Sequence, residues 1–276
     1  MRGTAEATSL AEKPTTQPPQ AVPLEERIAH VRNLIRRIGD DEVLSSFRRR
    51  FDMSWIYHDN ALEGVVFSGQ ELRAATDEQV VSDPALLPAF SEIRQHKTAI
   101  DLVREMATRK RLVVDLEVIK QIYAELAPEE SEGRGPPKYR KDMPLHRLYF
   151  HEISPPDKIA YRMRQLMEWV NAPETKRSMH PIRLAAKTHH RILQIFPFPR
   201  HSGKVARLLM NLLLLRAGFP PAIIHSTERQ RYYETLKSGG NQVATLVQEA
   251  LESSIESAAR YFEDALTASG PARITP

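Results

Sequence analysis

The chain contains no cysteine, has few aromatic residues and has no long uninterrupted hydrophobic run. Without cysteine it cannot form disulfides, thiolate metal sites or a cysteine nucleophile. Its most apolar run, Leu208–Leu215, is far shorter than the roughly 20 residues that a membrane-spanning helix needs. The first residues also lack the apolar core of a secretory signal peptide. We therefore expect a cytoplasmic protein that does not enter a membrane.

The 276 residues are enough for one large domain, and hydrophobic residues make up 41% of them, enough for a sizeable core. The formal net charge of +4 is compatible with binding phosphates or nucleic acid. The basic residues are spread along the chain rather than gathered in one tract, so nucleic acid is not the partner that we expect. A nucleic-acid-binding regulator that uses Arg48–Arg50 stays open as the weakest alternative.

Spacings of three and four between apolar residues predict helices from Leu24 onward. The predicted helices are 24–38, one through Phe51, 88–109, 115–127 capped by Asp115, 157–171, 181–195 beginning at Pro181, 203–217, one capped by Thr227 with Gln230, and 241–266. Asp59–Gly69 is expected to be a loop or a broken helix. The alternating pattern at 145–153 predicts one small β-hairpin.

These elements predict an all-α fold with one small hairpin. Residues 1–23 are rich in proline and poor in large apolar side chains, which is typical of a disordered segment. We divide the rest into N-terminal helices at 24–110, a core at 111–240, and a C-terminal helix and tail at 241–276.

The segment Phe196–Arg207 joins two predicted helices, and its charge is unusual for the start of a helix. Helix N-termini disfavour cations, each costing about 0.3–1 kcal/mol. Arg200, Lys204 and Arg207 nevertheless fall here, with His201 and without an acid. A break of a local rule is expected at a functional site. A solvated helix end whose basic residues pair with acids elsewhere is the alternative.

A bound phosphate group would explain this arrangement. Backbone N–H groups at the start of the helix would point at the anion, and basic side chains would neutralise it. The phosphate-binding candidates are Arg200, His201, Ser202, Gly203, Lys204 and Arg207. We expect Lys204→Ala together with Arg207→Ala to abolish anion binding and to leave the fold intact.

This segment resembles the Fic-domain signature HPFx(D/E)GNGRxxR, and the resemblance covers residues 25–240. The flanking stretches that resemble Fic sequence are His180-Pro181-Ile182, His189-His190, Leu208–Ala217, Gly218–Pro221 and Arg229–Leu236. The resemblance implies a Fic-type helical domain, and it places the family's flap at 145–153. Such a flap pairs with an extended protein target, although an edge ornament on the core is an equal alternative. Fic proteins often dimerise, so a homodimer is also implied.

Two positions depart from the family's motif. Phe196 stands at the motif's histidine, which deprotonates the target hydroxyl, and a phenyl ring cannot act as a base. Arg200 stands at the acidic residue that holds Mg²⁺, and a guanidinium cannot ligate a metal. We therefore assign no catalytic residue, with His201 as a weak substitute for the base, and we expect no metal. The ligand that the resemblance implies is ATP or another nucleotide.

Asp59–Gly64 resembles the inhibitory helix (S/T)xxxE(G/N) of many Fic proteins. Asp59 stands at the Ser/Thr position, while Glu63 and Gly64 match the motif. In those proteins the glutamate pairs with the second arginine of the signature, which matches Arg207. We expect a Glu63–Arg207 pair, with a solvated helix end at Glu63 as the alternative.

Three functions follow from these residues. The leading interpretation is a pseudoenzyme, a Fic-like protein that binds a nucleotide, another phosphate-containing ligand or a protein partner without adenylyl transfer. The second is a divergent protein adenylyltransferase, or a transferase of a related phosphate group, with a base other than Phe196. The third is the nucleic-acid-binding regulator.

Overall fold

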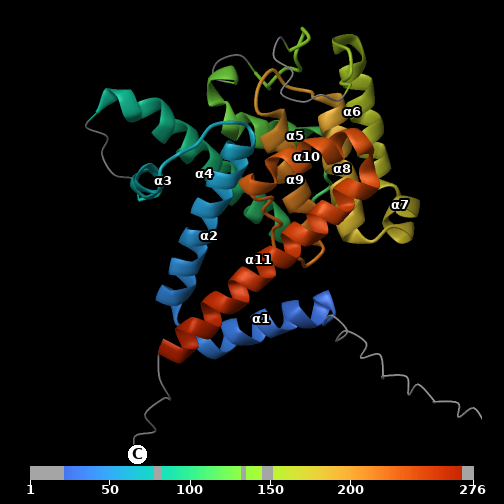
Figure 1. The fold of residues 1–276 in the computed structure, drawn as a ribbon. Coiled ribbons are helices and arrows are strands. Elements are labelled where there is room, and N and C mark those ends of the chain that lie inside the picture. The colour runs from blue at the N-terminus through green and yellow to red at the C-terminus, as the bar shows by residue number, and fades with distance from the viewer. Residues whose placement is uncertain (1–21, 78–82, 132–134, 145–151, 269–276) are drawn as a thin grey trace, which may run out of the picture.

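The computed structural model describes residues 22–77, 83–131, 135–144 and 152–268. In these residues all regular structure is helical, which confirms the predicted all-α fold class (Figure 1). The α-helices are α1 Leu24–Ile38, α2 Asp41–Leu62, α3 Gly69–Thr76, α4 Leu87–Thr108, α5 Leu116–Leu126, α6 Pro156–Asn171, α7 Pro173–Ser178, α8 Pro181–Ile195, α9 Ser202–Arg216, α10 Arg229–Ser238 and α11 Gly240–Ala268. The short 3₁₀-helices are η1 Pro84–Leu86, η2 Pro128–Glu130 and η3 Ser226–Glu228.

Local sequence features fix several helix ends. Pro181 is the first residue of α8, where its missing N–H costs nothing. The Asp115 carboxylate caps α5 by accepting the N–H groups of Glu117 and Val118, each at 3.0 Å. Gly39 ends α1 with a φ of 57°, a left-handed conformation that glycine adopts without a steric penalty.

Other predicted boundaries were wrong. Asp59–Leu62 is the last turn of α2 rather than a loop, because tertiary contacts of Asp59 and Asn60 hold it in the helix. α3 and α7 were not predicted. The capping box at Thr227 is also wrong, since η3 precedes α10 and Glu228 is the residue before the helix.

Two predictions fall mainly outside the described residues. The hairpin at 145–153 is described only at Glu152 and Ile153, which do not lie in a strand. The disordered segment 1–23 is described only at Val22 and Pro23. The division of the chain into 24–110, 111–240 and 241–276 stays a prediction.

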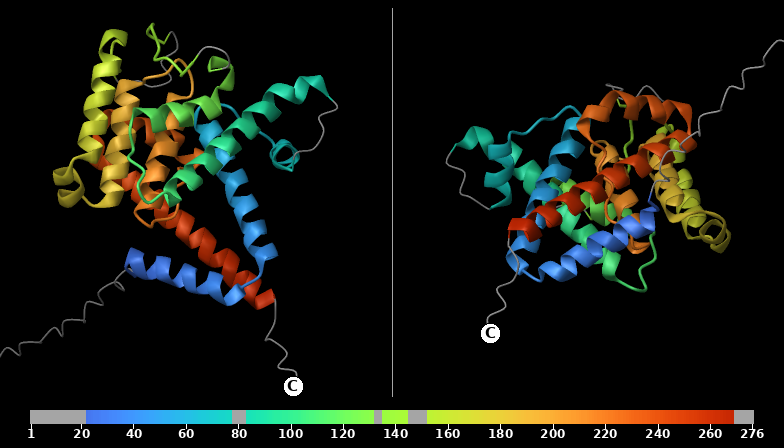
Figure 2. Two further views of the ribbon diagram at one scale, coloured as in Figure 1. Left: turned by 180° about the vertical axis from the view of Figure 1, so that it is seen from behind. Right: turned by 60° about the horizontal axis from the view of Figure 1, so that its bottom comes forward.

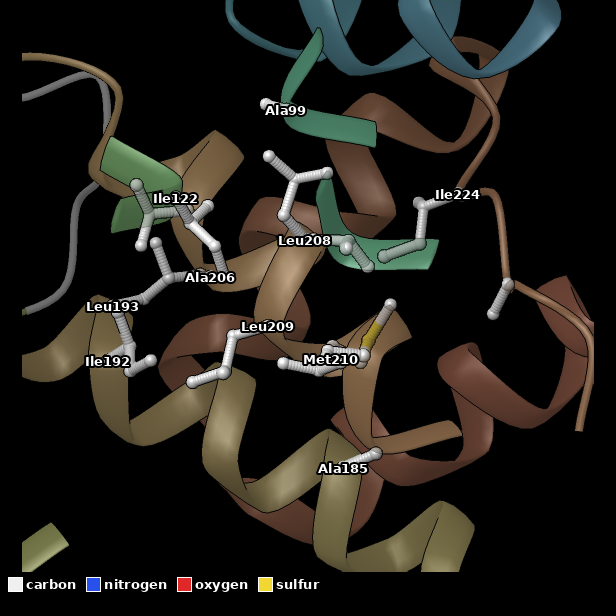
Figure 3. Packing of buried hydrophobic residues seen from close by; sticks show 14 of the residues in the cluster. Ala99, Ile122, Ala185, Ile192, Leu193, Ala206, Leu208, Leu209, Met210 and Ile224 are labelled. Carbon is white, nitrogen blue, oxygen red and sulfur yellow. The ribbon is translucent and has the colours of Figure 1, made fainter. Parts of the chain in front are cut away.

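α9 is the central helix of the core. Every residue from Ser202 to Leu212 is buried, so the helix has no solvent face over that length. It packs against α8, α4 and α5. Figure 3 shows Leu208, Leu209 and Met210 of α9 among apolar side chains such as Ile122 of α5 and Leu193 of α8. The segment that precedes α9 is therefore held by the best-packed part of the molecule.

α11 is the longest helix, and it joins the core to a second, smaller apolar cluster. It packs against α8 of the core and against α1. In Figures 1 and 2, α1 crosses the C-terminal half of α11 below the main body, with the start of α2 beside them. Leu34, Ala258 and Phe262 are the buried residues of this smaller cluster. None of the described helices is long and apolar enough to cross a membrane.

Candidate functional site

The segment between α8 and α9 has an unusual backbone. Phe196 and His201 have φ angles of 50° and 56°, and they are the non-glycine residues with positive φ in the described part of the chain. This region is costly for a bulky side chain and is seen where the surroundings impose it, often at functional sites. Phe198 helps to impose it, because its buried ring stacks on Tyr123 with centroids 3.9 Å apart.

Arg140, which precedes this segment in the sequence, also holds it in place. The sequence analysis did not identify Arg140 as a site residue. Its side chain is buried, and Nε donates to the Phe196 carbonyl at 2.7 Å while its backbone N–H donates to the Pro197 carbonyl at 2.9 Å. The guanidinium also donates to the carbonyls of Asp142 and Ser154. Burial lowers the pKa of Arg140. Arg140 thus ties the residues that flank 145–151 to the start of the loop.

Phe196 caps the end of α8, and its side chain is only 9% exposed. The ring belongs to the apolar core cluster. A hydrocarbon ring at this point has no group that accepts or delivers a proton. Phe196 is thus a packing residue in this structure.

Arg207 is buried, at 1% exposure, and the carboxylates of Asp59 in α2 and of Glu63, the residue after α2, bind it. Nε donates to Asp59 Oδ1 at 2.8 Å, and Nη2 donates to Glu63 Oε1 at 2.8 Å. Nη2 also donates to the Asp59 carbonyl at 3.0 Å, so Arg207 satisfies one of the carbonyls that the end of α2 leaves open. The structure brings Glu63 and Arg207 together, and it adds Asp59 as a second partner.

Asp59 is the centre of a buried polar network. Its Oδ2 accepts from Trp55 Nε1 at 3.2 Å and faces His96 Nε2 at 3.3 Å. Burial by itself would raise the pKa of Asp59, but Arg207 and then His96 outweigh it and lower the pKa to about 2. Burial lowers the pKa of His96, so it is neutral at pH 7. Because His96 Nδ1 accepts from Asn60 Nδ2 at 3.1 Å, its proton lies on Nε2, toward Asp59.

Lys204 is buried and donates to Glu92 Oε1 of α4 at 2.6 Å. Burial would raise the pKa of Glu92, but Lys204 outweighs burial and lowers it. The Glu92 side chain is 30% exposed, so this pair lies at the edge of the interior. Sequence reasoning missed Glu92, because nothing distinguishes it from other acids on the helix.

Arg200 and His201 have different surroundings, and their role in phosphate binding stays a prediction. Arg200 is half-exposed and pairs with Glu129 and, at 3.9 Å, with Glu130, so it turns toward η2. The pKa of His201 is lowered to about 4, first by burial and then by the charge of Lys204. His201 is therefore neutral at pH 7.

Ser202, Gly203 and Gly64 complete the predicted site. The Ser202 hydroxyl stays within the loop, accepting from the Phe198 N–H at 2.9 Å and donating to its carbonyl at 3.1 Å. Gly203 is buried in the first turn of α9, and no side chain caps that turn. Gly64 follows α2 with a φ of 93°, a conformation that favours glycine.

The residues present do not fit a Mg²⁺ ion of the Fic type. In the described residues no group of three or more His, Asp or Glu is placed to hold a metal. Arg200, at the family's acidic position, brings a positive charge, and the buried carboxylate of Asp59 binds Arg207. We derive no step that uses a metal.

Comparison with known proteins places this geometry in a family. Residues 113–214 match the model of the Fic/DOC family. The protein adenylyltransferase Fic of Drosophila mojavensis is 29% identical over 184 residues, which are 66% of this chain and 35% of that protein. Its counterpart in Aedes aegypti is 26% identical over 215 residues, 77% of this chain and 42% of that protein. The chain thus spans about a third to two fifths of the length of these relatives.

Solved structures share the fold. A Fic domain containing signaling protein from Bacteroides thetaiotaomicron superposes with a TM-score of 0.71 at 21% identity, covering 86% of this chain and 97% of that one. Fic-1 from C. elegans superposes with a TM-score of 0.69 at 21% identity, covering 88% of this chain and 73% of that one. The fold and the family match agree, and this chain therefore contains a Fic/DOC-family domain at residues 113–214.

Proposed function

We propose that this chain binds the phosphate groups of a nucleotide at the start of α9, and that it does so without adenylyl transfer through position 196. The observation that carries the proposal is the buried phenyl ring of Phe196 where the Fic signature has a base. Proton transfer by a positioned base contributes about 10²–10⁴-fold to such a reaction. Binding does not need that group, since it rests on the uncapped first turn of α9 and on Lys204.

A phosphate that binds in this site competes with carboxylates of the chain itself. Lys204 is held by Glu92 and Arg207 by Asp59 and Glu63, so a phosphate replaces carboxylates that are already in place. The Lys204–Glu92 pair is the weaker obstacle, because the Glu92 side chain is 30% exposed, whereas both side chains of the Arg207–Asp59 pair are buried. Asp59 is 2% exposed and Arg207 is 1% exposed. A ligand therefore engages Lys204 and the helix N-terminus before it engages Arg207.

Adenylyl transfer through another base is the second candidate. The matched relatives in Drosophila mojavensis and Aedes aegypti are named protein adenylyltransferases, which supports transfer more directly than binding alone. His201 is the imidazole inside the loop, and it is neutral at pH 7. Its pKa of about 4 makes it a weak acceptor, because general bases work best when their pKa lies near the working pH.

The proposal also includes partners other than a nucleotide. A protein partner at 145–153 and a homodimer rest on the resemblance to the family. The nucleic-acid alternative has less support, since Arg48 lies 3.5 Å from Asp101 and Arg49 lies 4.0 Å from Asp77. Those two cations face acids of the same chain.

Calorimetry with ATP tests the binding proposal. Lys204→Ala should weaken binding at least about tenfold, as expected for a charge-assisted contact. Glu92→Gln should strengthen it about fivefold, because it removes the competing carboxylate. Lys158→Ala is the matched control, since Lys158 is an exposed lysine in the first turn of α6. Equal affinity in all four proteins would place the anion elsewhere.

Transfer is tested separately with ATP labelled on the α-phosphate and a cell extract. We expect no label on protein with the wild-type chain. Labelling that His201→Ala abolishes would establish the second candidate instead.

A further inference from the structure

A cavity lies between α1, α2 and α11, away from the first turn of α9. It has a volume of about 530 Å³, within the range of about 300–1,000 Å³ of small-molecule sites. Residues of α1, α2, α4, α9 and α11 and of the turn Gly218–Pro221 line it. The apolar residues that form most of its wall are Ile28 and Val31 of α1, Phe47 and Phe51 of α2, and Ile255 and Phe262 of α11.

The wall of this cavity is buried in part. Ile28 is 8% exposed, Ile255 3% and Phe262 1%, whereas Phe47 and Phe51 are half-buried. Figures 1 and 2 show α1 lying across the lower part of α11. Such a space suits a slender hydrocarbon group better than the face of a partner helix.

The charges around the cavity have one sign. Of the residues that the structure describes, three arginines line it, Arg32, Arg48 and Arg104, and no aspartate or glutamate does. Arg104 is bound by Asp52, and Arg48 lies 3.5 Å from Asp101. Arg32 Nη2 donates to the carbonyl of Gly218 at 2.7 Å, and none of the described ion pairs includes Arg32. Arg32 thus has donors to offer to an anion at the edge of an apolar space.

We propose that this cavity binds a small anionic amphiphile, a single hydrocarbon chain that ends in a carboxylate. The chain lies between α1, α2 and α11, and the carboxylate accepts hydrogen bonds from Arg32. Apolar burial supplies most of the affinity, and the arginine selects the anionic head. This site is separate from the phosphate site of the proposed function, and it does not depend on it.

Dodecanoate, kept below its micelle concentration, is the probe, and calorimetry on the full chain is the measurement. We expect saturable binding at one site. Dodecyltrimethylammonium, with the same chain and a cationic head, should not bind. Equal binding of both probes, or no saturable binding of dodecanoate, would overturn the proposal.

Variants place the ligand. Arg32→Ala should weaken dodecanoate binding at least about tenfold, whereas Arg37→Ala, which changes an exposed arginine on the opposite side of α1, should not. Ala258→Trp fills the cavity and should abolish binding, with Val31→Phe as the replacement if thermal melting shows that the first variant is not folded. Unchanged binding in both Arg32→Ala and a folded cavity-filling variant would refute the site.

Discussion

Arg207 Nε donates to Asp59 Oδ1 at 2.8 Å, and both side chains are almost completely buried. Asp59 stands where the Fic inhibitory motif has serine or threonine, so this chain has a charged partner for Arg207 in addition to Glu63. The pair joins the last turn of α2 to the central helix α9. It also changes an expectation: Arg207→Ala would leave the Asp59 carboxylate buried without its main partner, so the fold should not stay intact.

Asp59→Asn should lower the free energy of unfolding by about 3 kcal/mol, because it removes one member of a buried ion pair and leaves Arg207 with Glu63 as its remaining carboxylate. The double variant Asp59→Leu/Arg207→Met should be more stable than Asp59→Asn, since it leaves neither charge of the pair in the interior. Denaturant unfolding measures both. A single variant as stable as wild type would show that Asp59 does not hold Arg207.

Arg140→Lys should lower the free energy of unfolding by about 3 kcal/mol. A lysine cannot reproduce the donors that reach the carbonyls of Phe196, Asp142 and Ser154, which lie in different parts of the chain. Lys141→Ala changes an exposed neighbour and is the control. If thermal and urea unfolding gave the two variants equal stability, Arg140 would not be the residue that positions the loop.

His58 should make stability depend on pH. Burial, and then His225, whose ring stacks at 4.2 Å, lower the pKa of His58 to about 4, against a smaller opposing effect of Asp59. A group with a lowered pKa in the folded state stabilises the fold above its unfolded pKa of about 6.5, and that contribution is lost as the pH falls through about 4. Stability should therefore fall between pH 6.5 and 4.

His58→Asn should reduce this dependence, because asparagine keeps an acceptor for the Ser226 N–H and does not titrate. Urea unfolding at pH 7 and pH 4.5 gives the comparison, with the exposed His30→Asn as control. The same loss of stability in His58→Asn as in wild type would assign the effect to another group.

Phe196→His alone should not create adenylyl transfer. The new imidazole would supply a base, but Arg200 would still stand at the family's metal-binding position and Glu63 would still bind Arg207. Transfer of α-phosphate label to protein is the assay, with Phe196→His/Arg200→Asp as the companion variant. Labelling by the single variant would mean that the base was the only missing part.

Local patterns predicted much of the helical fold. Pro181, the cap at Asp115 and the glycine after α1 act within a few residues of the boundaries that they set. The position of the loop Phe196–His201 was also predicted from the residues close to it. The end of α2 was not, because Asp59 and Asn60 favour loops locally and are held in the helix by contacts with α9 and α4.

The sequence by itself determined what two residues of the loop can offer. Phe196 and Arg200 are a hydrocarbon and a cation wherever they lie, so neither side chain can serve as a base or as a metal ligand. Only the tertiary structure decided which groups meet the remaining cations: Glu92 binds Lys204 across 112 positions, and Asp59 binds Arg207 across 148. The identity of a side chain fixes its chemistry, but helix packing fixes its neighbours, and burial decides how strongly they hold each other.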